Sequence, residues 1–192
     1  MEKIKKLAFL FFLFMMIEKI NAQETPIIRK GLLRVQGTIC TAYLLSEKES
    51  SFYLHGNLEG YTSSKISLAG EIYYNLGNPS GSKSAFNYNH SLFFGSSYHF
   101  TKKNNDLYIG IQPGACVTKI STDENSLALA QTGVNPLLST IFGYNFFVNK
   151  FFHFFVQSRL VIGQHNFDAP KDLSEFRFSA GLGFNINAIK TK

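Results

Sequence analysis

Long apolar runs are almost missing from this chain of 192 residues. After residue 22 there is no stretch of about 18 uncharged apolar residues, so the sequence predicts no transmembrane helix. The one apolar run, Leu7–Ile17, follows a lysine-rich start and leads to Ala22. A basic region, a short apolar region and a small residue in this order are typical of a secretory signal peptide. We expect residues 1–22 to be a cleaved signal peptide and residues 23–192 to form a single domain.

Cysteine is scarce as well. Neither Cys40 nor Cys116 has another cysteine or a histidine at the spacing of a metal site. A disulfide is conceivable in an exported protein. However, we place the two cysteines in strands on opposite sides of the molecule, whereas a disulfide needs Cα atoms within about 7 Å. We therefore expect two buried free thiols.

A stripe of basic residues is also missing. The net charge is +6, but the predicted signal peptide carries four lysines and two glutamates, which leaves +4 on residues 23–192. These charges are scattered through predicted turns and chain ends. The sequence therefore gives no support for a nucleic acid as partner.

The chain instead shows alternation of apolar and polar residues. In residues 52–61, for example, Leu54 and Leu58 alternate with His55, Asn57 and Glu59. A period of two predicts β-strands. Short and longer links alternate between these segments, as in an outer-membrane barrel. We predict an all-β fold, an eight-stranded antiparallel up-and-down transmembrane barrel, whose strands lie within residues 34–44, 52–61, 65–77, 89–100, 107–117, 137–147, 151–165 and 175–187.

Lysine is absent from the interiors of these segments, although it is the usual residue of a solvated sheet face. Arginine, glutamate and small polar residues take its place, which suits a narrow lumen where charges must pair. The predicted lumen charge network consists of Arg34, His55, Glu59, Glu71, Arg159, Glu175 and Arg177. Water would not tolerate the large apolar side chains of the other face as a continuous band. Its predicted lipid-facing residues include Phe94, Phe142, Phe152, Phe154, Leu160 and Phe178.

Four stretches carry a family resemblance: the signal ending "NAQ", the strand "LFFGSSYHF", the hairpin "FFVNKFFHFF" and the last strand "FRFSAGLGFNIN". In these the chain resembles the small eight-stranded outer-membrane β-barrel family, the porin-family group of OmpX-like and OmpA-barrel-like proteins of Gram-negative bacteria. The resemblance implies a place in the cell outer membrane, contact with its lipid, and both termini in the periplasm. The chain departs from many relatives by continuing with "AIKTK" after the last strand.

Aromatic residues, among them Tyr61, Tyr108 and Phe184, gather toward the rim with the short turns, although tryptophan is absent. Such a cluster is typical of the interfacial girdle of a membrane barrel.

The predicted lumen charges allow two interpretations. Pairing the second and third strands about a turn near Ser63 sets His55 roughly opposite Glu71, both pointing inward. A network of this kind forms either a salt-bridged plug or a narrow porin-like channel for small solutes or ions. The interior of an eight-stranded barrel is just wide enough for side chains to fill it, which favours the plug.

Catalysis has less support. Some barrels of this size are lipid A-modifying enzymes, and the deacylases among them carry His-x-Ser on one strand. None of the five histidines here belongs to such a motif, and His90 and Ser91 point to opposite faces because they are adjacent in a strand. His55, His99 and His153 face inward from separated strands, so we expect no metal site among them. Asp168 and Asp172 of the last long loop leave weak calcium binding conceivable, although solvated loop charge is the ordinary explanation. We predict a non-enzyme with no catalytic residue and no cofactor.

Residues 121–135 form the longest predicted loop and include a short apolar patch at 127–130. Binding residues concentrate on loops, so this loop is the candidate contact with an extracellular ligand or protein. The predicted function is therefore a structural or surface-interaction role through outward-facing loops.

Overall fold

The computed structural model describes residues 27–28, 30–78, 84–121, 131–167 and 170–188. The predicted signal peptide lies outside these residues. The strands are β1 (Leu32–Leu44), β2 (Glu49–Tyr61), β3 (Ile66–Gly77), β4 (Phe86–Lys102), β5 (Asn105–Ile120), β6 (Thr132–Phe147), β7 (Phe152–His165), β8 (Lys171–Asp172) and β9 (Glu175–Asn187). Within the described ranges, no helix is long and apolar enough to cross a membrane.

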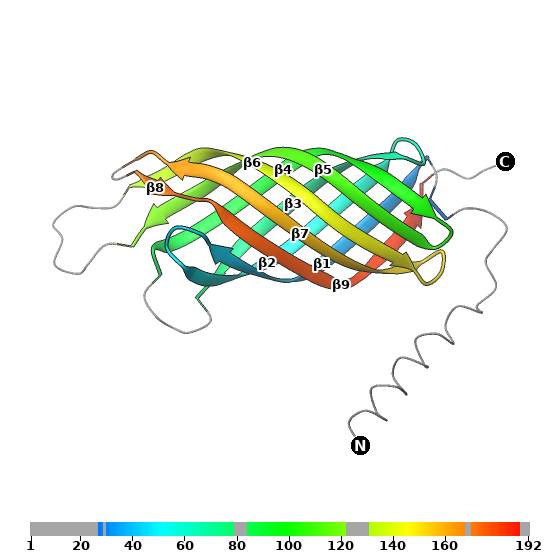
Figure 1. Cartoon of the computed structure of the whole chain (residues 1–192), viewed down its shortest axis with the longest axis horizontal. Coiled ribbons are helices and arrows are strands. Elements are labelled where there is room, and N and C mark those ends of the chain that lie inside the picture. The colour runs from blue at the N-terminus through cyan, green and yellow to red at the C-terminus, as the bar shows by residue number, and fades with distance from the viewer. Residues whose placement is uncertain (1–26, 29, 79–83, 122–130, 168–169, 189–192) are drawn as a thin grey trace, which may run out of the picture.

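The eight long strands close into a barrel (Figure 1). Each pairs antiparallel with the strand before and after it, and β9 returns to pair with β1. The short β8 pairs only with the end of β7. The predicted all-β, eight-stranded antiparallel up-and-down barrel is therefore confirmed.

The two ends of the barrel differ. The connections 62–65, 103–104 and 148–151 are short and lie at the end where β1 begins and β9 finishes, called here the turn end (Figure 1). The opposite end, the loop end, carries the connections 45–48, 78–85, 121–131 and 166–174.

Strands β4, β5 and β6 are longer than the sequence indicated, at 17, 16 and 16 residues. The ladder between β5 and β6 continues to Lys119 and Thr132. The alternation continues with it, because Val134 is 63% exposed and Asn135 only 1%. The prediction of a loop over 121–135 is therefore wrong for residues 132–135, which belong to β6, while 122–130 lie outside the described residues.

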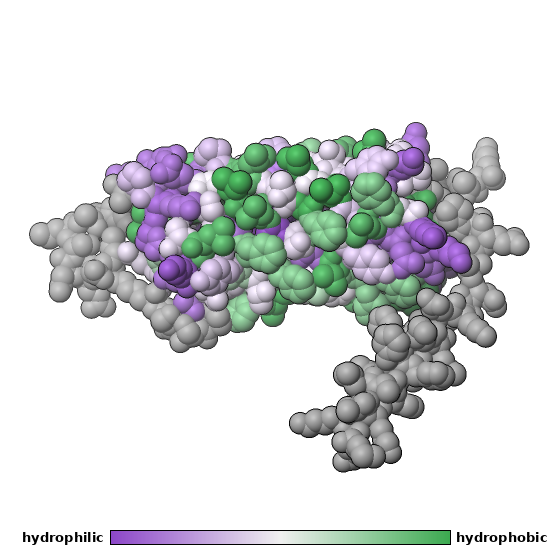
Figure 2. All heavy atoms as spheres, in the orientation of Figure 1, coloured by the Kyte–Doolittle hydropathy of each residue, from purple (hydrophilic) through white to green (hydrophobic). Residues whose placement is uncertain are grey.

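The alternation separates an apolar exterior from a polar interior. Apolar side chains cover much of the outer wall between more polar ends (Figure 2). The six residues expected to face lipid all lie on this outer wall, with exposed fractions between 36% and 60%. Two members of the expected aromatic girdle do not, because Tyr61 and Tyr108 are each only 3% exposed and point into the barrel.

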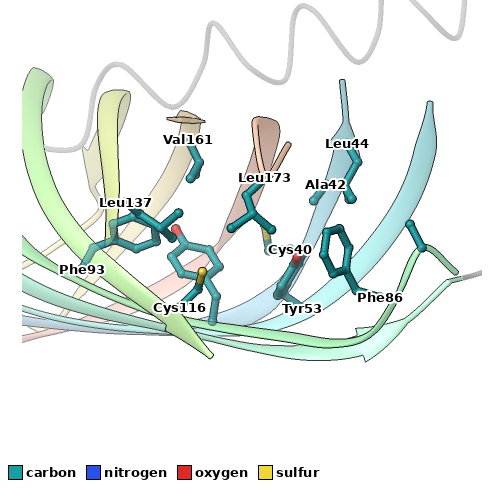
Figure 3. Close-up of a cluster of buried hydrophobic side chains, with 12 residues drawn as sticks. Cys40, Ala42, Leu44, Tyr53, Phe86, Phe93, Cys116, Leu137, Val161 and Leu173 are labelled. Atoms are coloured by element: carbon teal, nitrogen blue, oxygen red, sulfur yellow. The ribbon is translucent and has the colours of Figure 1, made fainter. Parts of the chain in front are cut away.

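An apolar cluster fills the lumen near the loop end (Figure 3). Leu44, Phe86, Leu137 and Val161 point inward from four strands. Leu173 joins them from the segment after β8 and is 1% exposed. The segment that follows β8 therefore helps to close the barrel at this end.

Both cysteines belong to the same cluster, and both are buried and free. Their strands, β1 and β5, are four pairings apart in the closed barrel and so lie on opposite walls, as expected. The two thiols thus act as small side chains pointing inward.

Glycine makes room for large inward side chains on neighbouring strands. Gly143 lies directly opposite Tyr108 in the β5–β6 ladder. A Cβ atom at Gly143 would lie 2.3 Å from Cζ of Tyr108. Gly183 receives the ring of His153 in the same way across the β7–β9 pair. At these positions a residue without a side chain lets an aromatic ring lie flat against the wall.

Candidate functional site

The lumen holds its charges in three layers along the barrel. The turn-end layer centres on Arg34 and Glu59, which face each other directly across β1 and β2 and form a buried ion pair. His99 extends this layer, with Nε2 3.2 Å from Oε1 of Glu59 and Nδ1 3.0 Å from Oδ2 of Asp106. Nη1 of Arg34 lies 3.8 Å from the same Asp106 oxygen. Arg34 and His99 thus each contact both carboxylates, those of Glu59 and Asp106.

The middle layer is built around the carboxylate of Glu71, which forms an ion pair with Arg159. Nε2 of His55 and Nε2 of Gln157 each lie 2.9 Å from Oε2 of Glu71. The hydroxyl of Tyr73 donates to the same oxygen at 3.0 Å. This carboxylate therefore has partners from two other strands, β2 and β7, and from Tyr73 on its own strand, β3.

Arg159 uses its whole guanidinium group. Besides its ion pair, it donates to Oγ of Ser139 at 2.6 Å, to Oε1 of Gln112 at 3.0 Å and to the hydroxyl of Tyr73 at 3.2 Å. Its Cζ lies 4.5 Å from the centre of the Phe93 ring. Side chains from four other strands thus meet on one guanidinium.

The loop-end layer pairs Arg177 with Glu175, two residues apart on β9 and therefore on the same face. Arg177 also donates to Oγ of Ser91 at 2.8 Å, and its Cζ lies 4.4 Å from the ring centres of both Tyr53 and Tyr73. The hydroxyl of Tyr53 donates to Oε2 of Glu175 at 3.0 Å. Tyr53 and Tyr73 also belong to the apolar cluster near the loop end, so this layer adjoins that cluster.

These contacts fill the cross-section of the barrel. The seven charged or ionisable residues predicted for the lumen are all 2% exposed or less. Burying an unpaired charge is costly, whereas a paired and hydrogen-bonded one is tolerated. The lumen charges are therefore held in ion pairs of opposite sign. Because they are buried, they are not accessible to a solute.

The structure brings the predicted network together with one change of register. Glu71 lies opposite Asn57, and His55 lies opposite Tyr73. His55 and Glu71 therefore meet diagonally instead of face to face, still at 2.9 Å.

Asp106 is an important lumen residue that the sequence analysis missed. It is fully buried and contacts both His99 and Arg34. The predicted strand began one residue later, at position 107. Extending the alternation of Tyr108 and Gln112 back by one step would have placed Asp106 on the inward face.

His90 and Ser91 lie on opposite faces of the wall. His90 stacks outside between Tyr74 and Tyr88, with ring centres 4.2 and 5.4 Å away. Ser91 points inward and receives the hydrogen bond from Arg177. The pair therefore has no shared geometry for nucleophilic catalysis, which needs the two side chains within hydrogen-bond reach.

In the described part of the chain, no group of three or more histidine, cysteine or acidic side chains is arranged to hold a metal ion. Asp168 of the last loop lies outside the described residues. Asp172 lies within them and accepts hydrogen bonds from the backbone amide and hydroxyl of Ser174 at 2.9 and 2.6 Å.

A closed antiparallel barrel of eight long strands, apolar outside and charge-paired inside, is the architecture of small outer-membrane barrels. No family model and no curated protein matches the sequence. Solved structures do match. OprG from Pseudomonas aeruginosa has a TM-score of 0.65 at 11% identity, covering 85% of this chain and 100% of that one. Neisserial surface protein A has a TM-score of 0.62 at 10% identity, covering 80% of this chain and 95% of that one.

Ail, the attachment invasion locus protein of Yersinia pestis, is also similar, with a TM-score of 0.52 at 12% identity over 82% of this chain and 99% of that one. Another structure shows Ail in complex with the heparin analogue sucrose octasulfate. At these identities the comparisons show a shared fold. They confirm the resemblance to small eight-stranded outer-membrane barrels at that level.

Proposed function

We propose that this chain is an exported, non-catalytic barrel of the cell outer membrane, with a closed lumen and with loops that act at the cell surface. The proposal includes removal of residues 1–22 and insertion of residues 23–192 as one barrel domain. The observation that carries it is the contrast between the two faces of the wall, an apolar exterior around an interior of paired charges.

The exterior supports a lipid environment. Phe94, Phe142 and Phe154 are between 55% and 60% exposed, and they lie on three different strands. In water a band of such side chains would drive association, whereas in hydrocarbon it costs nothing.

The interior argues against conduction. Arg159 and Arg177 project into the lumen from β7 and β9, and each is held by a carboxylate, by polar side chains and by aromatic rings. A solute passing through would have to break both ion pairs. We therefore favour the plug over the narrow channel.

The loop end is the side we assign to the surface role. The structure of Ail in complex with sucrose octasulfate, a heparin analogue, is an example of ligand binding by a barrel of this fold. In this chain the connection 121–131 is the candidate contact with an extracellular ligand or protein. The outer wall faces lipid in this proposal, and ion pairs occupy the lumen, which leaves the loops for binding.

Planar-bilayer recording tests the closed lumen. Only preparations whose unboiled gel band shifts on heating, the sign of an intact barrel, are used. We expect no discrete conductance steps. Steps whose ion selectivity changes in Arg159→Ala would overturn the closed lumen in favour of the channel.

Two further measurements test the rest. Trypsin added to intact cells should cut after Lys48 or Lys171 at the loop end and spare Lys65 at the turn end, and the reverse pattern would refute the orientation. Expression should leave lipid A unchanged in mass, whereas a modified lipid A that depends on His90 would establish an enzyme.

A further inference from the structure

The turn end carries a ring of lysines. Lys65 lies in the first short turn, Lys103 in the second and Lys150 in the third, while Lys102 ends β4 and Lys30 lies two residues before the start of β1. All five side chains are exposed. These five residues are called the lysine ring. Figure 2 shows hydrophilic residues at both ends of the wall, the turn end among them.

No exposed carboxylate balances the ring within the described residues. The two acidic residues nearest to it, Glu59 and Asp106, are 2% and 0% exposed and are turned inward toward Arg34. Among the described residues, the carboxylates that reach the surface are those of Glu47, Glu49 and Asp172, at the loop end.

The loop end is different because its charges are mixed and partly paired. Nζ of Lys171 lies 3.6 Å from Oε2 of Glu47. Glu49 accepts hydrogen bonds from the backbone amide of Ala85 and the hydroxyl of Ser84. Among the described residues, a cluster of lysines with no exposed carboxylate beside it is thus a property of the turn end.

The ring borders the part of the wall that faces hydrocarbon. Phe100 packs edge-on against Tyr98 just before Lys102, and the rings of Phe152 and Phe184 lie 5.3 Å apart beside the third turn. Nζ of Lys150 lies 5.0 Å from the ring centre of Phe151. Aromatic residues mark the interface of a membrane barrel, and lysines just beyond them reach the headgroups.

We propose that the lysine ring binds the headgroups of phospholipids with a net negative charge in the leaflet that adjoins the turn end. The distribution of the lysines favours a lipid leaflet over an acidic protein. They lie in or beside all three short turns and just before β1, so they surround the barrel, whereas a single protein partner would contact one side. This inference rests on the proposed membrane location.

The test uses the full-length mature chain refolded into vesicles of mixed phosphatidylcholine and phosphatidylglycerol. The protein is extracted in mild detergent and the lipids that remain bound are counted by mass spectrometry. Each lysine near an anionic surface contributes favourably, so we expect roughly tenfold enrichment of phosphatidylglycerol over its share in the vesicle. High salt should abolish the enrichment because exposed charges are screened.

A matched pair of variants locates the effect. Gln in place of Lys65, Lys103 and Lys150 should reduce the enrichment severalfold, whereas Gln in place of Lys48, Lys119 and Lys171 should leave it unchanged. The two triples are alike in backbone as well, since Lys48 and Lys103 have positive φ angles of 54° and 55°.

Equal retention of both lipids by heat-shifting wild-type protein would overturn the lysine ring as a lipid site and would leave an acidic protein as its occupant. Equal enrichment in the two triple variants would also overturn it. Absence of a heat-shifting band in every vesicle would instead refute the membrane barrel itself, so the two failures are distinguishable.

Discussion

Replacing Arg159 by methionine removes the positive charge of the middle lumen layer. Arg159 is 1% exposed, forms an ion pair with Glu71, and donates hydrogen bonds to Tyr73, Ser139 and Gln112. Methionine keeps a long apolar side chain but satisfies none of these partners. Removing one member of a buried ion pair costs about 3–5 kcal/mol, because the remaining charge stays buried without compensation.

The double variant Arg159→Met with Glu71→Gln separates the pair from its surroundings. Both charges are then gone, so the penalty for an unpaired carboxylate disappears. We expect the double variant to be more stable than the sum of the single variants predicts, with a coupling free energy of about 0.5–3 kcal/mol.

Lys171→Met provides the control, since Lys171 and Glu47 form an ion pair at 3.6 Å with side chains 27% and 29% exposed. A surface pair of this kind contributes about 0–1 kcal/mol. Tryptophan is absent, so equilibrium unfolding in guanidinium is followed by circular dichroism and by the heat-shifted gel band. Equal losses of unfolding free energy in Arg159→Met and Lys171→Met would show a solvated lumen and refute the closed one.

Other predictions concern packing, lipid contact and the thiols. Gly143→Val should collide with the ring of Tyr108 and destabilise the barrel by about 1–3 kcal/mol; Gly37→Val, with nothing within 4 Å of a new Cβ, is its control in the same unfolding assay. Phe94→Arg, at a mid-strand position 60% exposed on the outer wall, should cost about 2–4 kcal/mol in vesicles, and a near-zero cost would contradict lipid contact there. Both cysteines should resist maleimide labelling in the folded barrel and react after denaturation, since they are at most 1% exposed; rapid labelling of folded protein would contradict their burial.

Much of the wall was predictable because the period of two assigns each side chain to a face. Arg34, Arg159 and Arg177 lie on the inward face that alternation indicates, and Phe94 on the outward one. What alternation does not specify is how far one strand slides along its neighbour. The shift that brings His55 opposite Tyr73 is a whole period of two, so it changes the partner without changing the face.

Residues near strand ends were harder to assign. Asp106 lies at the turn-side end of β5, one residue before the predicted strand, although its parity with Tyr108 already indicates the inward face. Tyr61 and Tyr108 are of a residue type typical of an interfacial girdle, but in the alternation they lie at positions that face the lumen. Their position in the alternation, and not their residue type, determines that they are buried. Leu173 closes the loop end from an irregular segment, where no periodic signal exists.

The seam between β1 and β9 has a consequence for how the chain folds. The other seams of the barrel join strands that are neighbours in sequence, so they can form as local hairpins, whereas this seam pairs Leu32 with Asn187. A contact between such distant residues carries the largest loop-closure entropy in the molecule. The β1–β9 seam can form only after β9, the last strand, has been synthesised. Until then β1 and β7 each have an open edge that could pair with another chain. Closure of the barrel therefore requires the whole chain, and pairing of β9 with β1 and β7 removes both open edges.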